Sequence, residues 1–195
     1  LGGALAGDTT DGSIGIGASA LAALTTGGSN VAVGYQAADA NTTGSNNTVL
    51  GYQSLTTNIN GSNNVAIGSS SLYTFEATSD NDGCNTAVGA NSGYLVSTGQ
   101  DNVLIGENSG WINSGVSLTT GSDNTLVGTH SAIGAAGASN RTAIGNAVTA
   151  VADNSVTLGN ASVTDVYMSQ DSQAYVHSQN VPNHTSNTMA SPYYH

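Results

Sequence analysis

The 195-residue sequence has almost no positive charge: Arg141 is its single basic side chain, and the formal net charge is −11. Phosphate backbones are held by Lys and Arg, so this composition argues against nucleic-acid binding. The same deficit argues against docking on an anionic membrane. No run of 18 apolar residues is present to span a bilayer. The lack of lysine also excludes a P-loop and a Schiff base.

The sequence also has very little cysteine and no recognisable catalytic or zinc-binding motif. Cys84 is the only cysteine, so no disulfide can form within the chain, and we interpret it as a small buried residue of a repeat. A disulfide between chains is the alternative. His130, His177, His184 and His195 lack the spacing of zinc ligands, and the serines have no partnered His and Asp at a recognisable spacing. We therefore expect no enzymatic activity and no cofactor.

What the sequence does contain is a short repeat that ends in an aliphatic residue and a glycine. The glycines recur at a nearly constant interval, which makes most of the repeats 17-residue units. Low charge with 26 glycines is also seen in disordered chains, but the aliphatic pairs recur too regularly for disorder. A period this short is typical of a solenoid of stacked coils. The repeat glycines are Gly17, Gly34, Gly51, Gly68, Gly89, Gly106, Gly128, Gly145 and Gly159.

Each repeat glycine follows three residues whose outer two are mostly β-branched or leucine. A spacing of two places these two on one face of a strand, and we predict that this face lines the coil interior. The middle residue, from Gly15 to Thr157, is small or aliphatic and points the other way. Because an exposed column is normally polar, we expect a second copy of the chain to cover it in a symmetric oligomer. The predicted core is Ile16, Val33, Leu50, Ile67, Val88, Ile105, Val127, Ile144 and Leu158.

Turns and a second segment complete each predicted coil. Groups such as Gly-Ser-Asn-Asn at 61–64 favour a turn, and segments such as Tyr-Gln-Ser-Leu at 52–55 predict a second short strand. Position three after the first seven repeat glycines is always Ala or Ser, as close packing requires. Stacked coils place like residues about 4.8 Å apart, which predicts an amide ladder. Its members are Asn30, Asn47, Asn64, Asn85, Asn102 and Asn124.

The repeats predict two regions. Residues 1–165 are expected to form an all-β, parallel β-solenoid (β-roll) of about nine coils with 14–22-residue repeats. Residues 166–195 are expected to form a C-terminal cap or an arm that pairs with a neighbour. Alternating residues at 162–168 and 174–177 predict strands there.

Two motifs carry a family resemblance. Asn-Arg-Thr-Ala-Ile-Gly (140–145) and Asn-Ser-Val-Thr-Leu-Gly (154–159) resemble the head repeats of trimeric autotransporter adhesins of the YadA type. The longer units, such as residues 47–55, are similar to repeats of phage tail-fibre and spike proteins. The resemblance implies a left-handed β-roll, three chains wound side by side, and a role in surface attachment. The chain departs from the adhesin pattern in its longer, mostly 17-residue repeats, and in six of them the Asn stands one position closer to the glycine.

Two insertions break the period, and they hold the only Phe and the only Trp of the chain. Insertions in solenoids form loops, often on the binding face, and exposed aromatic rings suit glycans and protein anchors. We therefore predict Tyr73, Phe75 and Trp111 as ligand-binding residues, with packing between chains as the alternative.

A weak metal signal lies in the first insertion. Asp80 and Asp82 gather oxygen ligands of the kind that calcium prefers, although a turn-forming Asp and Gly is the simpler interpretation. Asp8 and Asp11 form a similar cluster with the same simpler interpretation, and no other metal site is expected.

Together these features predict a non-enzymatic structural protein located outside the cell or on a virion surface. The preferred function is the shaft or head of a phage tail fibre or spike that attaches to host-surface glycan. The alternatives are a bacterial trimeric adhesin head and a subunit of an extracellular filament that polymerises end to end. The expected partners are further copies of the chain, as a homotrimer or an end-to-end polymer, and a surface glycan or protein receptor. Neither a nucleic acid nor membrane insertion is expected.

Overall fold

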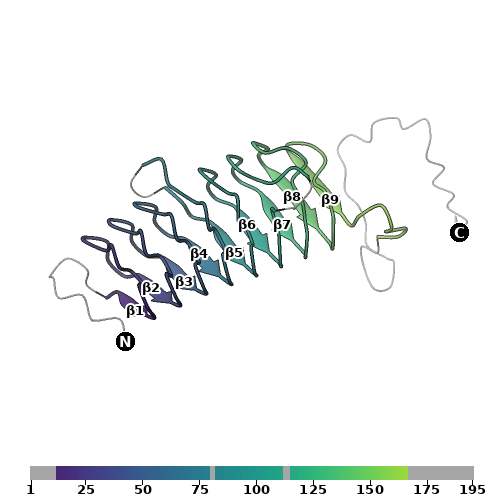
Figure 1. Ribbon diagram of the computed structural model, residues 1–195. Coiled ribbons are helices and arrows are strands. Elements are labelled where there is room, and N and C mark those ends of the chain that lie inside the picture. The colour runs from purple at the N-terminus through teal and green to yellow at the C-terminus, as the bar shows by residue number, and fades with distance from the viewer. Residues whose placement is uncertain (1–11, 80–81, 112–114, 167–195) are drawn as a thin grey trace, which may run out of the picture. The chain divides into compact units, whose positions relative to one another are not determined.

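The computed structural model describes residues 12–79, 82–111 and 115–166, which form nine short strands and no helix (Figure 1). The strands make one sheet in chain order, and each pairs in parallel with the next. The result is a parallel β-solenoid of about eight turns, which confirms the predicted fold class. The strands are β1 (Ile14–Ile16), β2 (Val31–Val33), β3 (Thr48–Leu50), β4 (Val65–Ile67), β5 (Thr86–Val88), β6 (Val103–Ile105), β7 (Thr125–Val127), β8 (Arg141–Ile144) and β9 (Ser155–Leu158).

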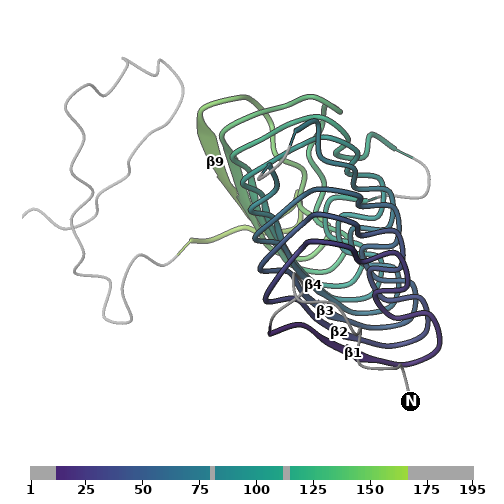
Figure 2. The same cartoon turned by 90° about the vertical axis from the view of Figure 1, so that its left-hand side faces the viewer.

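The strand register follows the repeat. Val65 of β4 pairs with Thr86 of β5, and Val103 of β6 pairs with Thr125 of β7, although an insertion lengthens each of these two intervals. The insertions therefore leave the ladder of strands unchanged. Figure 2 shows the strands stacked along one side of the coils.

The orientation of the strands is opposite to the predicted one. The middle residue of most triads is buried, as at Ala66 and Leu104, whereas Ile16 and Leu50 on the predicted core face expose 54% and 48% of their surface. The predicted core was therefore wrong as a set. The residues that lie exposed or half-buried outside the coil are Ile16, Val33, Leu50, Ile67, Val88, Ile105, Val127, Ile144 and Leu158.

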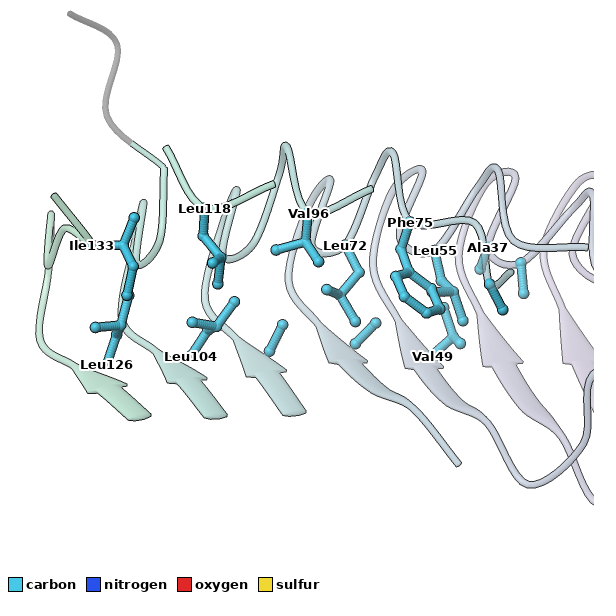
Figure 3. Packing of buried hydrophobic residues seen from close by; sticks show 14 of the residues in the cluster. Ala37, Val49, Leu55, Leu72, Phe75, Val96, Leu104, Leu118, Leu126 and Ile133 are labelled. Atoms are coloured by element: carbon cyan, nitrogen blue, oxygen red, sulfur yellow. The ribbon is translucent and has the colours of Figure 1, made fainter. Parts of the chain in front are cut away.

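The narrow coil explains this reversal. The middle strand residue meets the returning part of its own coil across the interior, so the two sides must be complementary in size (Figure 3). Where the strand carries Leu104, the returning segments carry Gly93 and Gly110, and a Cβ on these glycines would lie 2.8 and 3.3 Å from the Leu104 side chain. The interior thus takes small residues in most triads, and the bulky branched residues are left outside.

The second segment of each coil is not a strand in the described residues. Gln36 and Ala38 adopt left-handed backbone angles, with φ of 53° and 49°, and this alternation recurs in the following coils. An extended strand cannot contain such angles, so the segment folds as a series of turns. The small residues three positions after the glycine do pack closely: Ser54 and Ser71 are buried, with their hydroxyls 2.9 Å apart.

The six asparagines lie one above another in a buried amide ladder. From the second member onward, each Nδ2 donates to the Oδ1 of the preceding asparagine over 3.0 to 3.5 Å. That Oδ1 also accepts the backbone N–H of the following asparagine. The ladder therefore satisfies polar groups that the narrow interior shields from water. Its members are Asn30, Asn47, Asn64, Asn85, Asn102 and Asn124.

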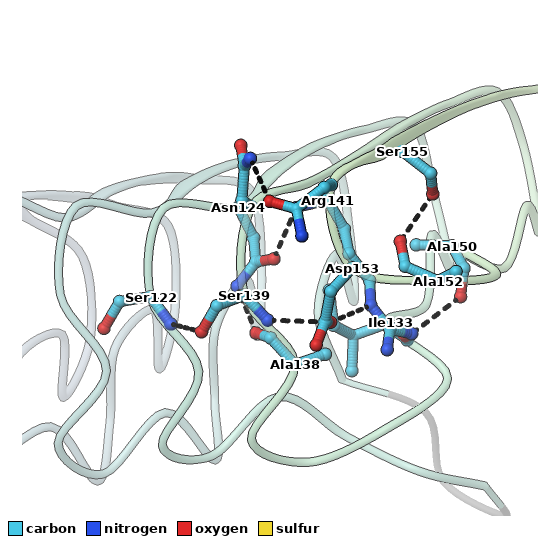
Figure 4. A network of polar contacts seen from close by, with 12 residues as sticks. Ser122, Asn124, Ile133, Ala138, Ser139, Arg141, Ala150, Ala152, Asp153 and Ser155 are labelled. Atoms are coloured by element: carbon cyan, nitrogen blue, oxygen red, sulfur yellow. Dashed lines mark hydrogen bonds and ion pairs between the residues drawn. The ribbon is translucent and has the colours of Figure 1, made fainter.

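Arg141 ends this ladder (Figure 4). Its backbone N–H donates to Asn124 Oδ1 over 3.0 Å, but its guanidinium has no acceptor to offer the next coil. Instead Nη1 donates to the carbonyls of Ile133 and Ala150 over 2.7 and 3.2 Å, and Nε donates to Asp153 over 2.7 Å. The only basic side chain of the protein is thus buried and hydrogen-bonded inside the last coils.

The Arg141–Asp153 ion pair should make stability depend on acid. The Arg141 guanidinium, helped by the backbone N–H of Ser139, holds the pKa of Asp153 below its ordinary value of 3.8. A carboxyl whose folded pKa is lowered stabilises the fold above its unfolded pKa, and this contribution is lost as the pH falls through the folded value. The loss in free energy of unfolding caused by Asp153→Asn, measured by urea unfolding, should therefore be larger at pH 7 than at pH 2. An equal penalty at both pH values would show that the ion pair adds nothing.

The region after β9 contains no strand in residues 162–166, where the sequence predicted one. A second compact unit begins at Thr164, and only its first three residues are described. The remainder of the expected cap or arm, 167–195, lies outside the described residues, as does the strand predicted at 174–177.

Candidate functional site

The outer side of the sheet is the largest candidate surface. We call it the strand face and define it as the first and third residues of each triad, which all point outward. At β1 these are Ile14 and Ile16, both about half exposed, and at β9 Val156 is two-thirds exposed. The third residues are the nine aliphatic residues first expected in the core. The first residues are Ile14, Val31, Thr48, Val65, Thr86, Val103, Thr125, Thr142 and Val156.

The strand face is uncharged and runs along all nine strands of the sheet. Its column of third residues is aliphatic in all nine strands, and its column of first residues contains only Ile, Val and Thr. Nine strands at about 4.8 Å spacing make the face about 40 Å long. Monomeric soluble proteins rarely expose an apolar patch of this extent. The sequence predicted an apolar column on the outside of the coil, formed by the middle residues of the triads. The structure does have an apolar outer surface, but the first and third residues of the triads form it.

The three predicted ligand-binding residues separate into two environments. Phe75 is fully buried and packs in the coil interior beside Ala77 and Gly61. Its assignment as a binding residue was therefore wrong. Tyr73 and Trp111 are half-buried, so part of each residue remains exposed to solvent.

Tyr73 and Trp111 belong to a surface row of three rings, which we call the aromatic stripe: Tyr73, Tyr94 and Trp111. The Tyr73 and Tyr94 rings stack with centroids 5.0 Å apart and planes 5° apart. The Trp111 ring lies 5.2 Å from Tyr94 and is tilted by 43°. Sequence reasoning missed Tyr94 because it lies outside both insertions. The available signal was its position, since all three rings stand fifth after their repeat glycine.

The weak calcium site gains no support from the described residues. Asp80 lies outside them, and Asp82 Oδ2 accepts hydrogen bonds from the hydroxyls of Ser79 and Thr78 over 2.7 and 2.8 Å. These bonds lower the pKa of Asp82. Among the residues that the structure describes, no three His, Cys, Asp or Glu side chains are grouped to hold a metal ion. Asp82 therefore acts as the acceptor of a local turn.

Cys84 is exposed rather than buried, which corrects the expectation for this residue. It stands in the turn before β5 with a φ of 53°, a backbone conformation that recurs at Asn63 and Asp101, the equivalent positions of the coils on either side. The side chain at this position points away from the interior because the next residue, Asn85, occupies the ladder. The exposed thiol is therefore set by the turn geometry.

The described part of the chain contains no helix of the length and apolar character that a membrane span needs. Comparison of the sequence with known proteins found no matching family model and no significantly similar curated protein.

Proposed function

We propose that the protein is a non-enzymatic structural β-solenoid that assembles with copies of itself through the strand face, as part of a surface-attachment fibre. The observation that carries this proposal is the uncharged aliphatic face that runs along all nine strands. Burial of apolar surface is the main favourable term in most protein association. A surface of this kind gains most from an apolar partner of matching length.

A second copy of the chain meets this requirement. It offers the same face with the same strand spacing. With one Arg and no Lys, the chain has no basic surface through which two copies could instead associate by charge attraction. The resemblance of the repeats to trimeric adhesin heads and phage fibres favours three copies around one axis. Three narrow solenoids with their strand faces turned inward form a rod with a dry centre and a polar exterior.

A phage tail fibre or spike that binds host-surface glycan is the preferred setting, outside the cell or on a virion. The dominance of 17-residue repeats supports this choice over a bacterial adhesin head, whose characteristic spacing of 14 appears only in the last interval. A filament that polymerises end to end is the second candidate. It is favoured by the uniform parallel register from β1 to β9, which a further copy can continue.

Ile105→Asp tests the assembly. Ile105 lies in β6 near the middle of the strand face, so the substitution places a carboxylate where three chains meet. Burying an unpaired charge is costly, so we expect a trimer for the unmodified protein and a folded monomer for the variant. Light scattering after size exclusion measures the mass, and circular dichroism checks the fold.

Thr43→Asp is the matched control, since it adds the same charge at an exposed turn away from the strand face. It should remain trimeric. A monomeric unmodified protein, or an Ile105→Asp variant that keeps the mass of the unmodified protein, would contradict assembly through the strand face. Long concentration-dependent polymers would favour the filament.

A further inference from the structure

A row of polar side chains runs beside the aromatic stripe on the same coils. We call it the amide row: Asn91, Asn108 and His130. Asn91 Nδ2 donates to Asn108 Oδ1 over 3.1 Å, and Asn108 Nδ2 lies 3.1 Å from His130 Nε2. All three residues have φ between 54° and 56°, so the backbone presents their side chains in the same direction. Unlike the buried asparagine ladder, this row reaches the surface, where Asn91 and Asn108 are half-buried and His130 is exposed.

The amide row and the aromatic stripe are joined coil by coil. The backbone N–H of Tyr94 donates to the Asn91 carbonyl, and that of Trp111 donates to the Asn108 carbonyl, each over 3.2 Å. These bonds close a turn from the amide position to the aromatic position, which keeps the two Cα atoms within about 7 Å. Two parallel rows, one of rings and one of amides, therefore follow the solenoid axis on adjacent coils.

This pairing of groups has the chemistry of a site for a polar ligand with apolar faces. Amide groups offer both donors and acceptors to hydroxyls, and aromatic rings offer apolar contact to C–H surfaces. The Tyr73 and Tyr94 rings each cover one face of the other, so the middle ring of the stripe, Tyr94, offers mainly its edge and hydroxyl for contact. The Trp111 indole is tilted against Tyr94, and the next residue in that column is the buried Ile133 rather than another ring, so the stripe ends at the indole.

Charge narrows the choice of ligand. Glu107 is exposed directly before Asn108, and the only cation of the chain, Arg141, is held inside the last coils by Asp153 and two carbonyls. An anionic ligand would therefore meet the Glu107 carboxylate without a Lys or Arg side chain to compensate, and His130 is the one side chain of the row that could donate to it. The stripe extends over two ring spacings, 5.0 and 5.2 Å, along the axis.

From these contacts we infer that the aromatic stripe and the amide row form one site for a neutral oligosaccharide that lies along the solenoid axis. The inference rests on the proposed attachment function and specifies its ligand class. Trp111 and Asn108 carry the greatest part of the contact, since they pair the ring at the end of the stripe with the central amide. Tyr94 holds the indole in place through the contact between their rings.

The test is binding of the full chain to an array of neutral and sialylated oligosaccharides of one to six sugars. We expect binding to neutral oligosaccharides longer than one sugar and little binding to sialylated ones. Trp111→Ala and Asn108→Asp should each weaken binding at least tenfold, the range of interface residues that dominate affinity. Asn108→Asp keeps the size and the tolerance for positive φ, so it tests the amide without removing a ring.

Tyr52→Ala and Gln53→Glu are the matched controls. Tyr52 stacks on Tyr35 with centroids 5.5 Å apart, and Gln53 donates to Gln36 over 2.8 Å, so the same two kinds of contact are removed from coils outside the proposed site. Both controls should bind like the unmodified protein. Circular dichroism and particle mass should be unchanged in all four variants.

The outcomes separate the site from the assembly. Absence of neutral-glycan binding, a preference for sialylated glycans, or equal losses in variants and controls would overturn the site. A trimer that Ile105→Asp dissociates would still support the proposed assembly in each of these cases. Attachment to cells that persists in Trp111→Ala would place the receptor contact elsewhere on the chain and would also overturn the site.

Discussion

Asn102→Ala should lower the free energy of unfolding by about 2–6 kcal/mol, because it leaves two buried backbone groups without partners at a cost of about 1–3 kcal/mol each. Asn102 Oδ1 accepts the backbone N–H of Asn124, and its Nδ2 donates to the carbonyl of Gly121. Alanine offers neither an acceptor nor a donor in their place. Urea unfolding followed by circular dichroism measures the change.

Two further variants show whether the ladder itself is responsible. Asn146→Ala removes an asparagine that is exposed, and its effect should stay within about 0.5 kcal/mol. Asn102→Asp keeps the acceptor but buries a carboxylate against Asn85 Oδ1, which raises the pKa of the new carboxyl. That variant should therefore be less unstable at pH 4 than at pH 7. A pH-independent loss in Asn102→Asp, or a small loss in Asn102→Ala, would show that the amides contribute little.

Gly51→Ala should be at least as damaging, by about 3–5 kcal/mol, because backbone strain and a steric clash act together. Gly51 has a φ of 147°, a backbone conformation that side chains other than glycine rarely adopt. A Cβ there would also lie 2.4 Å from the carbonyl oxygen of Gly68 in the next coil. That neighbour is backbone and cannot rotate away, so adjacent coils must separate. A lowered midpoint of thermal unfolding measures the effect.

Gly137→Ala is the control for the glycine substitution. A Cβ at Gly137 meets only the Thr120 hydroxyl, at 3.2 Å, and the backbone there is not in the left-handed region. Alanine reduces the freedom of the unfolded chain, so this variant should be neutral or slightly more stable. An equal loss of stability in Gly51→Ala and Gly137→Ala would mean that close backbone contact between coils is not what requires glycine at position 51.

The sequence predicted the nine strands of the sheet correctly, because stacking forces like residues to meet. The further strands expected in each coil and at residues 162–166 are absent from the described residues. The repeat period aligns Val31 with Thr48 and Thr48 with Val65, and the structure pairs these residues in register. Insertions could also be recognised from the period alone. They had to leave the ladder, because a shift by even a few residues would place turn residues in the sheet.

The sequence analysis assigned the wrong side of the strands to the interior. It relied on the branched, apolar character of the outer residues rather than on the alternation of side chains along the strand. Asn64 is a ladder residue and stands two positions before Ala66, so the two share a face of the strand. A buried asparagine ladder therefore requires a buried Ala66 and outward Val65 and Ile67. Branched residues were expected inside, but the interior of a single narrow coil has no room for them in most triads.

Phe75 illustrates the same error at a single position. Its assignment to an insertion suggested a loop, but Asn41, Asn58 and Val96 stand at the same distance from their repeat glycines, and all are buried. The equivalent positions in other repeats predicted the burial of Phe75 better than its neighbours in the sequence did. Tyr73 and Trp111 also follow their column, together with Tyr94, which no local irregularity marked.

The internal position of Arg141 has a consequence for resistance to proteolysis. Trypsin cleaves after lysine or arginine, and this chain offers it one peptide bond, within β8. Two main-chain oxygens and Asp153 fix that side chain in place, so the protease cannot seat it in its pocket until the last coils come apart. The rate of trypsin digestion is therefore set by local unfolding around β8 and β9 rather than by the rate at which trypsin collides with the protein.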